Sequence, residues 1–316
     1  MKLRSFLFGA AALAAFAAPV SAQQMPKVVI AISGWTGFAP LTLAEQTGLF
    51  KKHGVDVEIK FIAQKERHLA IQAGSVQGAA TTIDTFVVWN AAGVKLTQVL
   101  LLDKSNGADG IATRNSINKI SDLKGKTIAV DGPGTTPYFT MVNILKKNGL
   151  TVKDITLSTL APQPAANAFV AGQFDAAVTY EPYISIIRNK PESGKILATT
   201  KDYPVVVDTL AFQPDYIAKN PKIVQGVVNG FFDALDMIKK DPTKSYEIMG
   251  AKVKQNAEQF GKSASFIAWQ DKAANQAYFA KEMMDFLKFA TEIQLEAGVI
   301  KAAPDLNAMV NANFIK

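Results

Sequence analysis

The sequence predicts an α/β protein of two lobes, joined by two hinge crossings and followed by a helical C-terminal region. Three observations predict this fold. Short apolar runs alternate with amphipathic stretches from Lys27 to Phe212, which is typical of strands and helices around mainly parallel sheets. Two segments of the first half recur, in the same order, in the second half. After Gln213 the apolar residues follow helical spacing instead.

A secretory signal peptide is predicted over residues 1–22. Lys2 and Arg4 precede an apolar stretch at residues 6–18, and small residues end the segment at Ala22. The apolar stretch is shorter than the roughly 20 residues that a membrane-spanning helix needs. We therefore expect cleavage after Ala22 and a soluble product in the periplasm.

The composition is that of a globular protein held together by its core. Hydrophobic residues make up 48% of the chain and charged residues 19%, which is typical of a folded rather than a disordered protein. There is no cysteine, so no disulfide can form. Lysine and arginine outnumber the acids by 34 to 27, but they are scattered and form no arginine-rich stripe. Nucleic-acid binding is therefore not expected.

The first lobe is predicted over residues 23–105 together with 208–316. Its expected strands span 28–32, 55–61, 78–82, 96–102 and 205–212, and its expected helices span 40–52, 66–73, 84–92, 221–239, 243–251 and 276–297.

The second lobe is predicted over residues 106–207. Its expected strands span 127–131, 155–160, 176–179 and 196–199, and its expected helices span 137–147, 165–171 and 182–189. The chain is expected to cross between the lobes near 103–109 and 203–208. Two such crossings make a hinge, because a few backbone torsions can absorb closure of the lobes.

The internal repetition is visible in the residues themselves. The segment 51–55, Lys-Lys-His-Gly-Val, is echoed at 146–150 as Lys-Lys-Asn-Gly-Leu. The segment 73–82, from Ala-Gly to Thr-Thr, is echoed at 171–180, from Ala-Gly to Thr-Tyr. Ordered matches of this kind predict two lobes of similar construction.

Four segments resemble a known family. They are the helix opening Phe38–Phe50, the run Ser121-Asp122-Leu123-Lys124-Gly125-Lys126-Thr127-Ile128-Ala129-Val130, the run Phe169–Ala177, and the corner Tyr180-Glu181-Pro182-Tyr183. In this order they are similar to the nitrate, sulfonate, taurine and thiamine-precursor group of ABC-importer binding proteins. The resemblance covers nearly the whole chain after the signal peptide. It implies a periplasmic binding protein fold with two hinge crossings, and it leaves the ligand open.

The candidate ligand contacts lie on the loops after the predicted strands. In parallel α/β sheets ligands bind beyond the carboxyl ends of the strands, and in two lobes these ends face each other across a cleft. The ligand-binding candidates are Trp35, Thr36, Gly37, Gln64, Thr82, Asp84, Asn106, Asp109, Gly134, Thr135, Thr136, Tyr138, Glu181 and Asp208.

Two of these loops precede predicted helices. In the loop at 33–40, Trp35 either stacks on a ligand or covers the core of the lobe, and Thr36 can donate a hydrogen bond. In the loop at 132–137, glycines expose backbone N–H groups at a helix start, which favours a cluster of anionic oxygens. The alternative for this loop is a tight strand-to-helix turn. It lacks the Gly-Lys-Ser/Thr of a nucleotide-phosphate loop.

Thr82 and the acidic candidates each allow two interpretations. Thr82 and Asp84 either cap the following helix or contact the solute. Glu181 either caps a helix or receives a cationic or N–H group. Asp109 and Asp208 lie at the predicted crossings, as hinge hydrogen-bond acceptors or as ligand contacts. Acidic groups at several positions favour a solute with an amine or ring N–H beside any anionic group.

The predicted function is the substrate-binding component of an ABC importer that captures a small organic anion, sulfonate-like or taurine-like. The expected partners are this solute and a permease in the inner membrane, with a monomeric protein, no cofactor and no metal. The aromatic residues Trp35, Phe38, Tyr138, Tyr180 and Tyr183 favour a pyrimidine or other heteroaromatic solute as the alternative. A sensor that presents its closed form to a signalling receptor is a third interpretation.

An enzyme is the alternative in another class. Some proteins similar to this group take part in pyrimidine-precursor synthesis and use a histidine-rich, metal-dependent site. This chain has only His53 and His68, far apart in the sequence, and no cysteine or Gly-x-Ser-x-Gly nucleophile motif. We therefore expect no catalytic activity.

Overall fold

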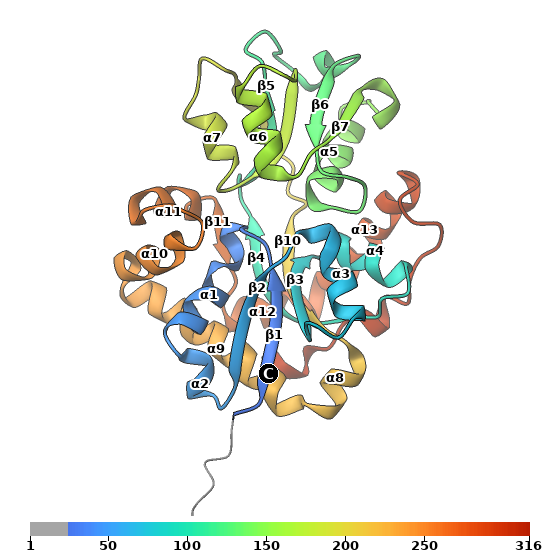
Figure 1. Cartoon of the computed structure of the whole chain (residues 1–316). Helices are drawn as coiled ribbons and strands as arrows, with labels where there is room; N and C mark the ends of the chain where they lie inside the picture. Colours follow the sequence, from blue (N-terminus) through green and yellow to red (C-terminus); the bar gives the residue numbers. More distant parts are fainter. Residues whose placement is uncertain (1–24) are drawn as a thin grey trace, which may run out of the picture.

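Two β-sheets, each flanked by helices, form the two lobes of the molecule (Figure 1). The computed structural model describes residues 25–316, so the predicted signal peptide and its cleavage site lie outside the described residues. The sheet of the first lobe has the strand order β11-β4-β10-β3-β1-β2, and that of the second has the order β7-β6-β8-β5-β9. The predicted two-lobed α/β fold is confirmed.

The first lobe contains the strands β1 (Lys27–Ile32), β2 (Asp56–Phe61), β3 (Gly78–Thr82), β4 (Thr97–Ser105), β10 (Val207–Phe212) and β11 (Ile267–Trp269). Its N-terminal helices are α1 (Ala39–Gln46), α2 (Leu49–Lys52), α3 (Gln64–Gln72) and α4 (Ile83–Ala91). The helix predicted over 40–52 is two helices, because the backbone at Gly48 turns left-handed with φ of 73°.

The helical C-terminal region follows β10. It comprises α8 (Pro214–Lys219), α9 (Pro221–Lys240), α10 (Pro242–Ala251), α11 (Ala257–Ala264), α12 (Lys272–Lys281) and α13 (Met283–Glu296). The helix predicted over 276–297 is α12 and α13, and the short strand β11 between α11 and α12 was not predicted. Within residues 25–316, no helix combines the length and the apolar character needed to cross a bilayer.

The second lobe contains the strands β5 (Asp109–Thr113), β6 (Thr127–Val130), β7 (Thr156–Thr159), β8 (Ala176–Tyr180) and β9 (Lys195–Thr199). Its helices are α5 (Thr136–Lys147), α6 (Pro162–Val170) and α7 (Ile184–Arg188). Strand β5 was not predicted; it is short and begins directly after a crossing.

The internal echo corresponds to a repeated sheet with repeated hydrogen bonds. In the order β2-β1-β3-β10-β4 and in the order β7-β6-β8-β5-β9, the fourth strand runs antiparallel to its neighbours. The amide of Val29 donates to Gln77 Oε1, and the amide of Thr127 donates to Asp175 Oδ2, both at 2.8 Å. Each residue of one pair lies 98 positions from its counterpart (127 − 29). The two lobes therefore share local construction as well as topology.

Two crossing segments connect the lobes, between β4 and β5 and between β9 and β10 (Figure 1). The hydroxyls of Ser105 and Thr200 lie 2.6 Å apart, and the amide of Gly107 donates to Thr200 Oγ1 at 2.9 Å. These bonds tie one crossing to the other. The division of the chain at 105/106 and 207/208 stays a prediction.

The C-terminal helices contact both lobes. Phe289 on α13 packs edge-on against Phe139 on α5, with ring centroids 6.3 Å apart. Lys146 on α5 forms an ion pair with Glu296 on α13. Ser263 on α11 donates to Glu181 Oε2, just after β8, at 2.9 Å. The C-terminal region thus lies on the first lobe and also touches the second.

Candidate ligand-binding cleft

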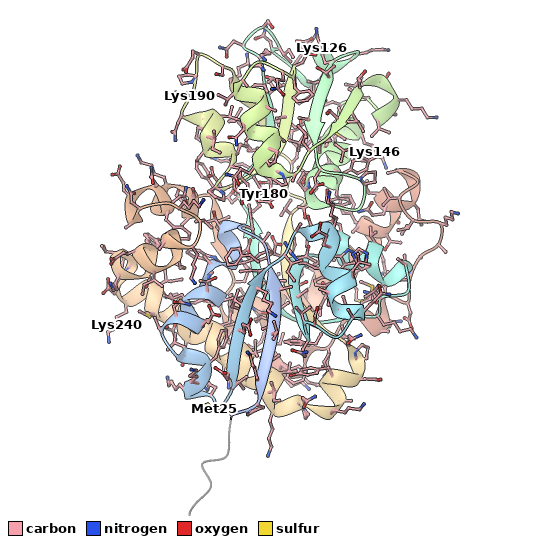
Figure 2. All side chains as sticks on the ribbon, viewed as in Figure 1. Met25, Lys126, Lys146, Tyr180, Lys190 and Lys240 are labelled. Carbon is pink, nitrogen blue, oxygen red and sulfur yellow. The ribbon has the colours of Figure 1, made fainter. Side chains whose placement is uncertain are left out.

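A small cavity lies where the two lobes meet. Its walls come from the ends of β1, β3 and β8, from the starts of α3 and α5, and from both crossings. The lining residues are Ser33, Trp35, Phe38, Gln64, Arg67, Thr81, Thr82, Asp109, Thr136, Tyr180, Val206 and Asp208. Figure 2 shows Tyr180 at the level where the lobes face each other. Of the predicted contacts, Trp35, Gln64, Thr82, Asp109, Thr136 and Asp208 lie in this wall.

The loop after β1 supplies an aromatic wall. Trp35 Nε1 donates to Asp103 Oδ1 at 3.1 Å, and its ring packs edge-on against Tyr180, with centroids 5.5 Å apart. A Cβ atom on Gly37 would overlap both the Asp103 carboxylate and the indole nitrogen of Trp35. Gly37 therefore acts by leaving room for this bond. The hydroxyl of Thr36 is buried and, within the described residues, has no hydrogen-bond partner.

Hydrogen bonds join the lobes beside the cavity. Gln64 Nε2 on α3 donates to Thr136 Oγ1 on α5 at 2.7 Å, and Thr136 Oγ1 lies 2.9 Å from Thr82 Oγ1. The amide of Thr136 donates to Gln64 Oε1 at 3.3 Å. The hydroxyl of Thr85 donates to the Gly134 carbonyl at 3.4 Å. The helix start predicted to hold an anion thus makes contacts with the other lobe in this closed arrangement.

Arg67 on α3 is the functional candidate that sequence reasoning missed. Its side chain is 1% exposed, and burial lowers its pKa to about 10, so it stays charged at neutral pH. Its Nε donates to the carbonyl of Ile62 at 2.9 Å, and its Nη1 donates to the carbonyl of Ala80. Among the described residues Nη2 has no partner. The surrounding Lys65, Glu66 and His68 gave no signal that this side chain points inward.

Four carboxyl groups lie buried around the crossings: those of Asp84, Asp103, Asp109 and Asp208. Burial raises the pKa of Asp109 and of Asp84 to about 7. Burial also raises the pKa of Asp103 to about 8, although the hydrogen bond from Trp35 opposes this shift. The pKa of Asp208 lies well above its usual value because of burial and the charges of Asp103 and Asp109. Neither Asp84 nor Asp103 lies in the cavity wall.

Two oxygens of Asp109 and one of Asp208 face this region without a bond. In the part of the chain that the structure describes, both carboxylate oxygens of Asp109 and Oδ2 of Asp208 lack a hydrogen-bond partner. Both side chains line the cavity and are 1% and 2% exposed. Buried polar groups in proteins are normally bonded, so these oxygens are candidates for solute contacts.

The remaining predicted contacts lie elsewhere. Asn106 is exposed, and its backbone N–H donates to the carbonyl of Phe266 at 2.8 Å. Tyr138 packs in the hydrophobic core of the second lobe. The hydroxyl of Thr135 donates to the carbonyl of Gly132 at 2.8 Å. These side chains share loops with the cavity wall but point away from it.

Glu181 is likewise outside the cavity wall. Its Oε1 accepts from Ser185 at 2.9 Å and from Arg188 at 3.4 Å, and its Oε2 accepts from Ser263. Burial raises its pKa, and these bonds oppose the shift. It therefore joins the second lobe to α11.

Neither of the two histidines lies in the cavity wall. His53 ends α2, with Nε2 3.0 Å from Asp233. His68 on α3 packs against the Trp89 ring, and burial lowers its pKa. Within residues 25–316, no group of three His, Cys, Asp or Glu side chains could hold a metal ion.

A family model matches most of this chain. The model described as NMT1/THI5-like matches residues 35–245, which include both crossings and nearly all of the cavity wall. The chain belongs to the NMT1/THI5-like family. This chain is 24% identical over 237 residues to the taurine-binding periplasmic protein of Escherichia coli, covering 73% of this chain and 71% of that protein.

Solved structures share the fold of this NMT1/THI5-like chain. One is the alkanesulfonate-binding protein SsuA from Xanthomonas axonopodis pv. citri, with a TM-score of 0.74, 20% identity and coverage of 90% of this chain and 98% of that chain. Another is the periplasmic nitrate-binding protein NrtA from Synechocystis PCC 6803, with a TM-score of 0.73, 15% identity and coverage of 92% and 87%. The homologues and structural neighbours are thus periplasmic sulfonate-, taurine- and nitrate-binding proteins of ABC importers, as the resemblance implied.

Proposed function

We propose that this chain is the periplasmic substrate-binding component of an ABC importer and captures a small organic anion between its lobes. The observation that carries the proposal is Arg67, a buried guanidinium in the cavity wall whose Nη2 has no partner among residues 25–316. A buried cation in this position favours a carboxylate or sulfonate, because a charge-assisted hydrogen bond compensates for its burial. The proposed partner is a permease of the inner membrane, and the protein is proposed to act as a monomer without catalysis.

The size of the cavity and the contacts between the lobes support a small solute. The cavity is smaller than the ~300–1,000 Å³ typical of ligand pockets, so it favours a compact solute. Gln64, Thr82 and Thr136 join the lobes directly beside it. Closure around a solute would remove water from its polar contacts, and the hydrogen bonds across the lobes would stabilise the closed form.

A heteroaromatic solute is the second candidate. Trp35, Phe38 and Tyr180 line the cavity and could stack on a ring, while the carboxylates could accept from ring N–H groups. This candidate differs from the first in one respect: it does not require an anionic group opposite Arg67.

Calorimetric titration distinguishes the two candidates. The panel consists of taurine, alkanesulfonates, nitrate, dicarboxylates and pyrimidines, added to the purified protein without its signal peptide. We expect binding of at least one sulfonate or carboxylate and a large loss of its affinity in Arg67→Lys, which keeps the charge but loses the planar fork. Binding of pyrimidines alone, unaffected by Arg67→Lys, would support the heteroaromatic candidate. The importer role predicts that deletion of the gene abolishes uptake of the bound solute.

A further inference from the structure

We infer that the captured solute also carries a primary ammonium group, held by Asp109 and Asp208 at the crossings between the lobes. This inference rests on the proposed function, in which Arg67 binds the anionic end. The solute would then be a compact zwitterion, with its two charges divided between α3 and the crossings.

The unpartnered carboxylate oxygens carry the inference. Asp109 begins β5 and Asp208 lies on β10, so each crossing places one carboxyl in the cavity wall. Three of their oxygens lack a partner in the described part of the chain: both oxygens of Asp109 and Oδ2 of Asp208. A primary ammonium group has three N–H donors. The three N–H donors of an ammonium group therefore equal the three unpartnered carboxylate oxygens in number, and the two groups have opposite charges.

Two other carboxylates, Asp175 and Glu181, are bonded by groups of the protein. Asp175 accepts from the amide and the hydroxyl of Thr127, both at 2.8 Å. Glu181 accepts from Ser185, Ser263 and Arg188. These carboxylates are satisfied by protein groups, whereas Asp109 is not. An unpaired buried carboxylate costs free energy, so a cation supplied by the solute is the compensation that the geometry leaves open.

The acidic groups around the cavity favour a zwitterion over a plain anion. Arg67, Asp109 and Asp208 line the same cavity, and the carboxyls of Asp84 and Asp103 lie buried outside its wall. A solute with only a negative charge would add to an excess of acids in a region of low dielectric constant. A zwitterion adds no net charge and meets both signs.

The test compares ligands that differ only in the amine. Taurine is titrated against ethanesulfonate, and β-alanine against propionate, by calorimetry at neutral pH. We expect at least one amine-bearing member to bind about tenfold or more tightly than its partner, because a hydrogen bond to a charged group is strong when buried. In Asp109→Asn this preference should fall to within about threefold. Asp208→Asn should lower it in the same direction, which guards against misfolding of a single variant.

Asp175→Asn is the matched control. It removes a carboxylate of the same lobe that is remote from the cavity, and the equivalent position of the first lobe already holds an amide, Gln77. The control should keep the full preference for the amine. Thermal unfolding should show that Asp109→Asn is at least as stable as the wild type, because the substitution removes an unpaired buried charge.

The outcomes separate this inference from the proposed function. If ethanesulfonate or propionate binds as tightly as its amine-bearing partner, the ammonium site is wrong while capture of an anion stands. If none of the four acids nor any other anion binds, but neutral aminopyrimidines do, both are wrong. If the preference survives in Asp109→Asn and Asp208→Asn, the amine is held elsewhere and the inference fails.

Discussion

The two lobes repeat one scaffold but differ in the side chains that they bring to the cavity. Their sheets have equivalent strand orders, and the amide bonds of Val29 to Gln77 and of Thr127 to Asp175 recur 98 positions apart (127 − 29). At the same spacing, however, the counterpart of Arg67 on α3 is Ala165 on α6. The first lobe carries the buried guanidinium, and the second has a small apolar residue in its place.

Different residues therefore determine the backbone of each lobe and the charged groups in the cavity. Strand ends and helix starts are repeated, because they fix the backbone of each lobe. The charged groups in the cavity are not repeated, which agrees with the proposed solute of unlike ends.

The largest effect is expected from an arginine in each lobe. Arg67 bonds the carbonyls of Ile62 and Ala80, and Arg114 of the second lobe bonds three backbone carbonyls. Arg67→Ala and Arg114→Ala should each lower the free energy of unfolding by about 2–5 kcal/mol, since buried acceptors lose their donors. Only Arg67→Ala should abolish solute binding. Urea unfolding measures the change in stability, and calorimetry measures the change in solute affinity. If both variants lose the same affinity, Arg67 affects binding only through the stability of the fold.

The second prediction concerns pH. The carboxyls of Asp84, Asp103, Asp109 and Asp208 have raised pKa values in the folded protein, through burial first. In the unfolded chain they titrate near 3.9, so between about pH 4 and 8 the folded state binds more protons. The stability that these groups contribute is therefore present below pH 4 and is lost as the pH rises through about 7–8.

Thermal unfolding across this range measures the effect without solute. Each extra bound proton changes the free energy of unfolding by about 1.4 kcal/mol per pH unit. Asp109→Asn should make the decline of stability between pH 4 and 8 shallower. Arg67, Glu181 and Tyr180 also face the buried carboxyls, so these three residues are kept unchanged in the variant. A stability that rises steadily from pH 5 to 8 in the wild type would contradict the shifts.

The third prediction tests the repeated hydrogen bond. Gln77→Ala should lower the free energy of unfolding by about 0.5–1.5 kcal/mol, and Asp175→Ala by about 1.5–3 kcal/mol, because the second acceptor is charged. Hydrogen bonds from Thr127 lower the pKa of Asp175, so its contribution is present near neutral pH and is lost in acid. Urea unfolding at pH 7 and pH 3 measures both; an Asp175 effect that persists at pH 3 would contradict this assignment.

The smallest effect is expected at the contact between the lobes. Thr136→Val removes the hydroxyl that bonds Gln64 and Thr82, at about 0.5–1.5 kcal/mol for each bond. Solute affinity should fall about three- to tenfold or more, and small-angle scattering should show a larger radius of gyration. Thr140→Val on the same helix is the control, because its buried hydroxyl has no partner within residues 25–316. If both variants bind alike, the Thr136 bonds do not hold the closed form.

The sequence by itself determined the two lobes, their repeated construction and the family. The alternation of strands and helices and the ordered echo are local patterns, and local geometry produces them wherever they occur. The sequence also pointed to the correct loops for most of the cavity wall, since loops after parallel strands gather at one edge of a sheet.

Only the tertiary structure decided which side chains enter the cavity. Arg67 stands among charged residues on a helix that the sequence marks as polar, yet packing of α3 against β3 turns it inward. Tyr138 and Asn106 share loops with the wall but point into the core and into solvent. A loop fixes where the backbone lies, while the direction of each side chain depends on neighbours from distant parts of the chain. The presence of one arginine and two aspartates in the same cavity wall could therefore not be predicted from the sequence.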